Sequence, residues 1–385
     1  MASYEFQMPS LGADMDAGTL VSWSVKPGDA VKRGQVVAVV ETQKGAIDVE
    51  IWQDGIVEKL VVEPGAKIPV GALLATVAVN GEITAPAAPA PQKPAAAAQP
   101  AAAPAPAAAP PARARVSPAA RKLAEELGVD VSTLVPSAAD GVISRADVER
   151  AAKGAKPQPK AADWHAQMRA AIAAAMSRSK REIPHYYLAT DIDVTKVSDW
   201  LTAENLKRSV TERLLPAVPY MKAVALALRE VPELNGFWSD GAFRPSAAVH
   251  LGMAIAMRGG GLVAPAIHDA ESKSLDQLMA DLRDLITRVR GGRLRSSEMS
   301  DPTVTLTSLG DLGVDGVFGV IYPPQVAIVG LGKVGERPRV EGGAVVVRKV
   351  VTATLAADHR ASDGHRGGLF LAALDKLLQE PEKLR

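Results

Sequence analysis

The residues best suited to acid–base chemistry lie near the C-terminus, in the segment Ala-Asp-His-Arg-Ala-Ser-Asp-Gly. His359 and Asp363 lie four positions apart in this segment, at a predicted junction between a strand and a helix. A neutral imidazole titrates near pH 7, so it can take a proton from a substrate. An isolated histidine is more often structural, and this is our interpretation of the remaining ones: His165, His185, His250, His268 and His365.

A second candidate, Lys44, lies in the segment Glu-Thr-Gln-Lys-Gly-Ala between two apolar runs. The surrounding sequence is repeated, because Val25–Glu41 aligns with Val62–Ala78 and both contain a Pro-Gly pair and a later glycine in register. Pro-Gly turns and short valine-rich runs predict strands. Two such units predict an all-β domain with approximate two-fold symmetry, with Lys44 at a hairpin tip. From spacing alone, a lysine at an exposed turn is usually only solvated.

Two linkers divide the chain. Residues 85–112 contain only alanine and proline apart from Gln92, Lys93 and Gln99. Such a tract cannot bury a core, and at roughly 3.1 Å per residue it can span on the order of 80–90 Å. The shorter segment Lys-Gly-Ala-Lys-Pro-Gln-Pro-Lys-Ala-Ala predicts a second linker. The expected organisation is a domain at 1–80, a linker at 81–113, a domain at 114–152, a linker at 153–164 and a domain at 165–385.

Composition excludes several classes of function. The chain has 385 residues and a formal net charge of +1, so there is no global reason to expect nucleic-acid or membrane binding. It contains no cysteine, which excludes disulfides, thiolate metal sites and a thiol nucleophile of the protein itself; we expect no metal. The N-terminal segment lacks the pattern of a secretory signal, so we expect a cytoplasmic location.

The C-terminal domain has a mixed α/β pattern. Apolar residues recur with helical spacing over Leu275–Val289 and again over Leu369–Leu378. Alternation predicts strands around Tyr186–Val194 and Val304–Leu306, and Val345–Leu355 is predicted to be a strand running up to His359.

The context of Lys44 resembles the lipoyl domain, in which a lysine at a hairpin tip is amidated by lipoic acid. The usual motif of that family is Glu-Thr-Asp-Lys-Ala, from which Gln43 and Gly45 depart. Biotin-bearing domains share the fold but have methionines on both sides of the lysine, and these are absent here. The resemblance implies that lipoic acid is attached covalently to Lys44.

Residues 114–152 are predicted to form two short helices, which start at Ser117-Pro118 and at Ser144. This segment resembles the peripheral subunit-binding domain, which binds the decarboxylase component or dihydrolipoamide dehydrogenase. Arg121 and Lys122 match the basic docking positions of that family.

The subunit-binding segment also departs from the family. The loop that is Gly-Thr-Gly in the family is Pro136-Ser137-Ala138 here, and Val142 replaces an arginine. One electrostatic contact with partners is therefore missing.

The segment Asp358–Gly364 resembles the catalytic motif Asp-His-Arg-x-x-Asp-Gly of the dihydrolipoamide acyltransferases and of the related chloramphenicol acetyltransferase fold. Further similar segments are Ile183–Leu188, His250–Ala270, Thr305–Gly310 and Tyr322–Gly332. The resemblance implies an α/β two-layer sandwich of the chloramphenicol acetyltransferase type, and the first of these segments favours the pyruvate type.

The resemblance also implies roles for individual residues. His359 would take the proton of the coenzyme A thiol, of which only a few per cent is ionised at neutral pH when its pKa is about 8.5. Thr307, in Thr-Ser-Leu-Gly, aligns with the hydroxyl that stabilises the oxyanion in the family, and Ser308 is a weaker candidate. Asp363 would hold the His359 loop, through a buried ion pair or through the amides of a helix N-terminus.

Together these resemblances imply a multidomain acyltransferase that moves an acyl group, by expectation acetyl, from dihydrolipoamide to coenzyme A within a 2-oxo acid dehydrogenase complex. The implied partners are the 2-oxo acid decarboxylase component, dihydrolipoamide dehydrogenase and further copies of this chain, as homotrimers that assemble into a larger core. Two alternatives stay open: a non-catalytic lipoyl-bearing scaffold, and an acyltransferase that serves a different 2-oxo acid.

Overall fold

The computed structural model describes residues 2–10, 15, 17–42, 45–79, 115–127, 142–145, 147–148, 161–257 and 261–385. The N-terminal part is all-β, as predicted. Its strands form two sheets, one in the order β1-β8-β6-β3 and the other containing the order β5-β4-β2-β7. The strands are β1 (Ala2–Gln7), β2 (Ala17–Trp23), β3 (Ala30–Val31), β4 (Gln35–Thr42), β5 (Gly45–Ile51), β6 (Gly55–Leu60), β7 (Lys67–Pro69) and β8 (Leu73–Val79).

The sequence repeat of this domain is also a repeat of backbone conformation. Gly28 and Gly65 have φ values of 95° and 92°, and Gly34 and Gly71 have values of 80° and 84°. These left-handed conformations favour glycine, which lacks a Cβ atom, so the Pro-Gly turns require it in both halves. The two sheets enclose a core that includes Leu20, Val40, Ile47, Leu74 and Val77.

The middle part contains α1 (Pro118–Leu127) and a parallel pair of short strands, β9 (Arg115–Val116) and β10 (Val142–Ile143). Ser117 caps α1 as predicted, because its Oγ accepts a hydrogen bond from the amide of Ala120 at 3.2 Å. Ser144 and Asp147 are also paired, because Asp147 Oδ2 accepts hydrogen bonds from the Ser144 amide at 2.9 Å and from the Ser144 hydroxyl at 2.8 Å. The second predicted helix lies largely outside the described residues.

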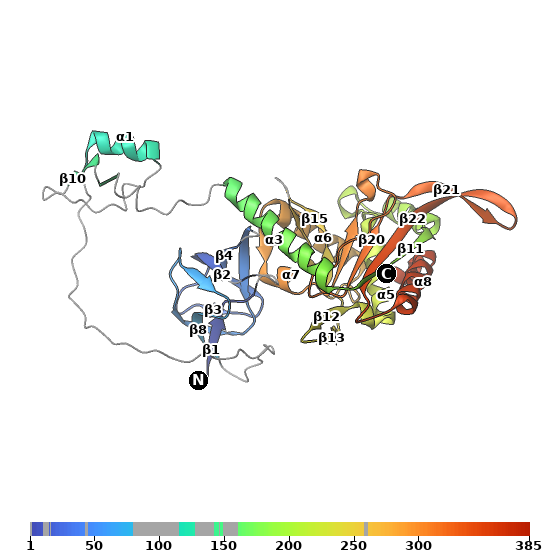
Figure 1. Ribbon diagram of the computed structural model, residues 1–385, viewed down its shortest axis with the longest axis horizontal. Coiled ribbons are helices and arrows are strands. Elements are labelled where there is room, and N and C mark those ends of the chain that lie inside the picture. The colour runs from blue at the N-terminus through green and yellow to red at the C-terminus, as the bar shows by residue number, and fades with distance from the viewer. Residues whose placement is uncertain are drawn as a thin grey trace. The chain divides into compact units, whose positions relative to one another are not determined.

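The C-terminal part is built on a mixed sheet in the order β11-β22-β20-β19-β14-β17, with β21 added beside β22 (Figure 1). Its strands are β11 (His185–Asp193), β14 (Leu251–Met253), β17 (Ala266–Ile267), β19 (Val304–Ser308), β20 (Ala327–Leu331), β21 (Gly335–Glu341) and β22 (Ala344–Asp358). Shorter strands are β12 (Gly236–Ser239), β13 (Ala242–Pro245), β15 (Ile255–Ala256), β16 (Leu262–Val263) and β18 (Leu294–Arg295).

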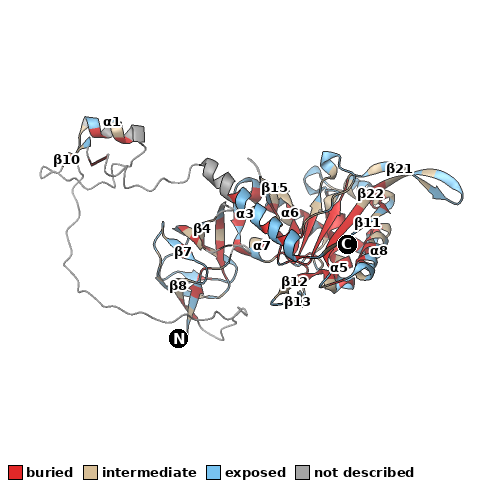
Figure 2. Ribbon diagram, viewed as in Figure 1, coloured by how far each residue is buried: buried red, intermediate tan, exposed pale blue. Residues whose placement is uncertain are grey.

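The helices of this part are α3 (Ala161–Glu182), α4 (Thr195–Leu206), α5 (Ala217–Glu230), α6 (Leu275–Arg290), α7 (Ser296–Ser300) and α8 (Gly364–Gln379). Single 3-10 turns lie at Val210–Glu212, Pro232–Leu234, Gly310–Leu312 and Pro381–Leu384. Side chains of α4, α5, α6 and α8 form one buried core with the sheet. Figure 2 colours the buried residues of the ribbon red. The predicted two-layer α/β sandwich is confirmed. No helix in the described part of the chain is long and apolar enough to cross a membrane.

The longest strand, β22, pairs with different strands at its two ends. Its C-terminal part lies between β11 and β20, pairs with both and ends at Asp358. Its N-terminal part pairs with β21 to form a hairpin that projects from the rest of the domain (Figure 1). The strand therefore joins the predicted catalytic histidine to the projecting hairpin through one continuous backbone.

Candidate functional site

His359 lies immediately after the last residue of β22, at the edge of the sheet where β11 begins. Its backbone amide donates a hydrogen bond to the carbonyl of Pro184 at 3.0 Å. Its ring makes an edge contact with the ring of Tyr186, with 5.4 Å between centroids. The Tyr186 hydroxyl lies 2.9 Å from Ser362 Oγ, so the same tyrosine contacts both the histidine and the loop that follows it.

Asp363 is the N-cap of α8. Its carboxylate accepts a hydrogen bond from the amide of Arg366 at 3.0 Å. The hydrogen bond from that amide, and a further one from the amide of His365, hold the pKa of Asp363 below its ordinary value. Of the two contacts considered for Asp363, the structure shows the one with helix amides. The loop between His359 and Asp363 is therefore held between a strand end and a capped helix.

The residues directly before and after His359 form an ion pair with each other. Asp358 is fully buried, and Arg360 donates to its two carboxylate oxygens, from Nε at 2.9 Å and from Nη2 at 2.7 Å. The Arg360 guanidinium also lies 4.6 Å from the centre of the Trp238 ring. A buried carboxylate requires such a partner, because desolvation of an unpaired charge is costly. The sequence analysis did not identify this arrangement, although both charged residues are adjacent to the histidine.

Thr307 lines a pocket at the C-terminal end of β19. Thr305 and Thr307 share a face of the strand, and the Thr305 hydroxyl donates to Gln325 Oε1 at 2.7 Å. The pocket wall also includes Tyr322 and Pro324. Ser308 is exposed and does not line the pocket, so it is Thr307 that faces inward.

Close packing of a neighbouring loop explains two glycines of the segment Tyr322–Gly332. A Cβ atom added at Gly330 would lie 2.1 Å from the carbonyl oxygen of Val317, and one at Gly332 would lie 1.8 Å from that of Asp315. The loop that carries Asp315 and Val317 therefore lies directly on β20, which leaves room for glycine alone.

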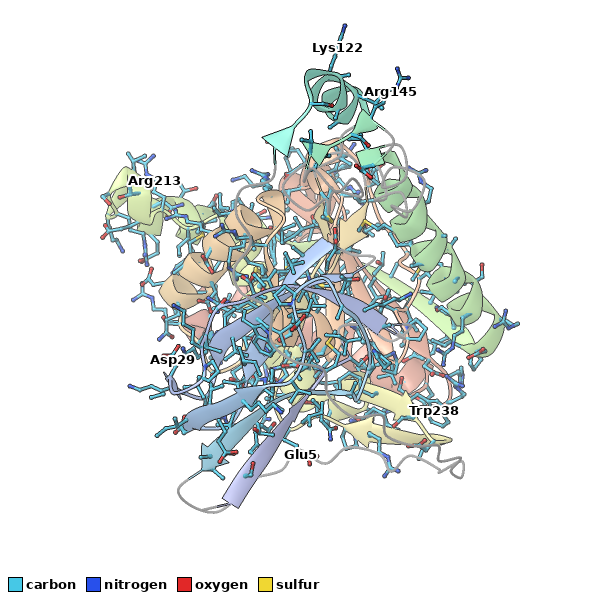
Figure 3. All side chains as sticks on the ribbon, turned by 90° about the vertical axis from the view of Figure 1, so that its left-hand side faces the viewer. Glu5, Asp29, Lys122, Arg145, Arg213 and Trp238 are labelled. Carbon is cyan, nitrogen blue, oxygen red and sulfur yellow. The ribbon has the colours of Figure 1, made fainter. Side chains whose placement is uncertain are left out.

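Trp238 connects the pocket with the His359 segment. It lies on the β12–β13 hairpin, labelled in Figure 3, and its backbone amide donates to the carbonyl of Pro324 at 2.8 Å. Trp238, Pro324 and Arg360 all line the pocket that contains Thr307. A chain of contacts thus runs from the histidine segment to the threonine strand.

Within one copy, however, Thr307 and His359 do not meet. Thr307 pairs with Gly330, and Gly330 pairs with Thr354, so Thr307 is level with a residue two strands away. His359 follows Thr354 by five positions. With about 4.8 Å between strands and about 3.3 Å per residue, the two Cα atoms are roughly 15–20 Å apart. A base and an oxyanion donor that serve one reacting carbonyl must each lie about 3 Å from it.

The other residues singled out in the sequence are placed as follows. Lys44 lies outside the described residues; the flanking strands pair Thr42 with Gly45, which leaves Gln43 and Lys44 between them. The Arg121 side chain also lies outside the described part. Lys122 is exposed and points away from α1, as Figure 3 shows.

Two half-buried histidines have structural contacts, as expected. His185 Nδ1 lies 2.8 Å from the carbonyl of Ile183, and its Nε2 accepts from the amide of Ile321 at 3.2 Å. In a neutral ring one nitrogen donates and the other accepts, so both nitrogens of His185 have a partner. Burial lowers the pKa of His185. Burial likewise lowers the pKa of His250, whose Nδ1 accepts from the amide of Asp269. In the described part of the chain, no three His, Asp or Glu side chains cluster as metal ligands would.

Three protein families match this chain. Residues 159–385 match the 2-oxoacid dehydrogenases acyltransferase catalytic domain, residues 4–77 match the biotin/lipoyl family described as biotin-requiring enzyme, and residues 114–149 match the E3-binding domain. The dihydrolipoyllysine-residue acetyltransferase component of the pyruvate dehydrogenase complex of Rhizobium meliloti is 33% identical, over 97% of this chain and 98% of that protein. The lipoamide acyltransferase component of the branched-chain alpha-keto acid dehydrogenase complex of Bacillus subtilis is 31% identical, over 98% of each chain.

Solved structures show the same relationship for the C-terminal part. A probable dihydrolipoamide acetyltransferase from Listeria monocytogenes matches with a TM-score of 0.53 and 31% identity, over 59% of this chain and 96% of that one. The cubic core of a pyruvate dehydrogenase multienzyme complex matches with a TM-score of 0.54 and 27% identity, over 57% and 90% of the two chains.

Proposed function

Because this chain belongs to the 2-oxo acid dehydrogenase acyltransferase family, we propose that His359 and Thr307 carry its transfer step and that the transferred group is acetyl. A member of this family moves an acyl group between dihydrolipoamide and coenzyme A. Relatives of similar identity are named for the pyruvate complex and for the branched-chain complex. The name of the Rhizobium meliloti relative and the Ile183–Leu188 segment support acetyl.

The proposed attachment site is Lys44. The pairing of Thr42 with Gly45 fits such a site, because it leaves a lysine in a two-residue connection between antiparallel strands. A lipoyl group there supplies a dithiol that carries the acyl group as a thioester.

Each proposed catalytic residue has a defined task. His359 takes the proton of the coenzyme A thiol as the sulfur attacks the acyl carbonyl carbon. Thr307 donates a hydrogen bond to the acyl oxygen as negative charge develops there. The carbon–sulfur bond to dihydrolipoamide then breaks, and His359 returns the proton to the departing sulfur. Asp363 contacts no reacting atom in this scheme and fixes the loop that carries His359.

We assign the two groups of one site to two copies of the chain. The observation that carries this assignment is the separation of roughly 15–20 Å between Thr307 and His359 within one copy. A head-to-tail contact that places His359 of one copy beside Thr307 of the next forms a ring when the rotation between copies closes. A ring of three copies, assembled further into a larger core, is the arrangement we propose. The Asp358–Arg360 pair and the capped α8 hold His359 in place, which a pure scaffold would not require.

The remaining partners follow from the middle domain. Its match to the E3-binding domain supports docking of dihydrolipoamide dehydrogenase, and the decarboxylase component is the second proposed partner. We assign Arg121 and the exposed Lys122 to this contact, with an acidic surface on the partner. A cytoplasmic location is part of the same proposal.

Mixed assemblies test the shared site. His359→Ala and Thr307→Val chains carrying different tags are co-expressed, and assemblies that contain both are purified. Each variant alone should be nearly inactive, whereas mixed assemblies should regain about a quarter of wild-type turnover, since one pairing in four joins an intact His359 to an intact Thr307. The control pairs His359→Ala with the double variant, which cannot form an intact site. Mixed assemblies without regained turnover would refute the assignment.

A further inference from the structure

Gln325 is a buried polar residue of the pocket wall that has no task in the transfer step. It is 4% exposed, lies two residues before the start of β20 and lines the pocket that contains Thr307. Its carbonyl oxygen, Oε1, accepts the hydrogen bond from the Thr305 hydroxyl at 2.7 Å. Among the described residues, its amide nitrogen, Nε2, has no hydrogen-bond acceptor.

A buried amide nitrogen without an acceptor is uncommon, because nearly every buried polar group in a protein is hydrogen-bonded. Removing such a group from water costs free energy that only a new acceptor offsets. Protein covers Gln325 except where it borders the pocket. The acceptor that the amide nitrogen lacks is therefore supplied by a molecule that occupies the pocket.

The Gln325 amide is held in place by contacts with three neighbouring segments. Its backbone amide donates to the carbonyl of Tyr322 at 2.9 Å, and its backbone forms a bridge with Phe237 of β12. The Thr305 hydroxyl of β19 fixes the carbonyl end of the side chain. The amide nitrogen is thus oriented before a ligand arrives, which lowers the entropic cost of binding one.

Gln325 and Thr307 offer two hydrogen-bond donors along one pocket. Thr305, which holds Gln325, precedes Thr307 by two residues on the same face of β19, so about 7 Å separates the two threonine Cα atoms. A substrate whose acyl oxygen meets the Thr307 hydroxyl can reach Gln325 with a second acceptor that lies several bonds farther along the same molecule.

Apolar side chains from three elements line this pocket: Met168 and Ile172 of α3, Val263 of β16 and Ile328 of β20. The dihydrolipoamide arm is a hydrocarbon chain that ends in a single amide group, which matches an apolar wall with one free donor. The pantetheine arm of coenzyme A carries two amides and a hydroxyl. Burying all of these polar groups against such a wall would be costly, because most of them would have no partner.

We propose that Gln325 binds the amide carbonyl of the dihydrolipoamide arm and so anchors the acyl carrier while His359 and Thr307 act on the thioester. This inference rests on the proposed function, because it requires that transfer takes place in the Thr307 pocket. Gln325 contacts no reacting atom, and its hydrogen bond to the carrier is equally strong in the ground state and in the transition state. Loss of the bond should therefore weaken binding of the carrier and leave the transfer step unchanged.

Two substitutions of Gln325 in the full-length chain test the proposal. Gln325→Met removes the donor at similar side-chain length, and Gln325→Glu keeps the acceptor for Thr305 but presents oxygen in place of the N–H group. Gln379→Met is the matched control, because the Gln379 amide donates to the carbonyl of Asp193 at 2.7 Å and does not line the pocket. Circular dichroism melting checks that each variant is folded.

Steady-state kinetics give KM for free dihydrolipoamide and for acetyl-CoA in turn. The same measurement with an alkane dithiol, which has a methyl group in place of the carboxamide of dihydrolipoamide, isolates the contact with the carbonyl. Gln325→Met and Gln325→Glu should raise KM for dihydrolipoamide about three- to tenfold, as expected for one neutral hydrogen bond. They should change kcat, KM for acetyl-CoA and KM for the alkane dithiol less than about twofold. Gln379→Met should leave all of these values near those of the wild type.

An unchanged KM for dihydrolipoamide in both Gln325 variants, or a rise confined to acetyl-CoA, would overturn the assignment of the carrier amide to Gln325. An equal rise in KM for dihydrolipoamide and for the alkane dithiol would overturn it as well, since the effect would then not depend on the carbonyl. In either case the proposed transfer step would stand. That step is refuted by a different result, a Thr307→Val variant that keeps the wild-type kcat.

Discussion

Asp358 and Arg360, which flank His359 in the sequence, form a bidentate ion pair with each other. The carboxylate is fully buried, and the guanidinium lies over the ring of Trp238. The pair fixes the backbone on both sides of the histidine. It also connects that backbone to the wall of the pocket that contains Thr307.

Asp358→Asn should therefore lower kcat more than it raises KM, because it displaces His359 without removing a substrate contact. We expect a loss of stability of about 2 kcal/mol, below the usual cost of breaking a buried pair because Arg360 is 30% exposed. Urea denaturation and steady-state kinetics check both effects. Arg360→Lys should also lower kcat, because an ammonium group cannot make the two parallel hydrogen bonds that the planar guanidinium makes to the Asp358 carboxylate. Unchanged kcat in both variants would exclude a positioning role.

Thr307→Val removes the hydroxyl while keeping the shape of the side chain. It should lower kcat by about 10²–10³ with little change in KM, because the lost hydrogen bond forms with charge that develops in the transition state. Thr307→Ser should retain substantial activity. Ser308→Ala is the matched control, and it should be nearly silent because Ser308 faces away from the pocket. The opposite pattern in these two variants would assign the donor to Ser308.

Lys44→Arg should abolish activity of the complete complex and preserve transfer to free dihydrolipoamide. The positive charge is kept, but arginine cannot be lipoylated. Intact-mass spectrometry followed by peptide mapping should locate the lipoyl group on Lys44 of the wild type. Lipoylation of another lysine would contradict the proposed attachment site.

Stability should fall as the pH drops below about 6.5, in part because of His185. Burial lowers the pKa of His185 in the folded protein, so the unfolded chain takes up its proton first as the pH falls. The folded state is therefore favoured above the unfolded pKa, and this contribution is lost towards the lower folded pKa. Urea midpoints between about pH 5 and pH 7.5 should change less steeply in His185→Gln. Part of the slope should persist because His250 has the same direction of shift; an identical slope would exclude His185 as a source.

Local patterns in the sequence were sufficient for many elements of the fold. Alternation and helical spacing correctly predicted β22, α6 and α8, and the capping role of Asp363 was one of two contacts considered. These features depend on residues that are close in sequence, where side-chain periodicity and helix starts carry the information.

Features that depend on distant segments could not be predicted in this way. The contact of Arg360 with Trp238 joins elements that are far apart in the chain. The separation of Thr307 from His359 follows from the order β22-β20-β19, which no local pattern specifies. The strand prediction for Val345–Leu355 was correct, but periodicity alone cannot show that Val345 and Val347 are exposed within one chain.

The most direct test of the account is the turnover of His359→Ala with acetyl-CoA and free dihydrolipoamide. Loss of the general base should reduce kcat by about 10²–10⁴, while the assembly mass and the melting temperature stay near those of the wild type. A variant that assembles normally and keeps most of its turnover would contradict the assignment of His359 as the base and would favour the scaffold alternative.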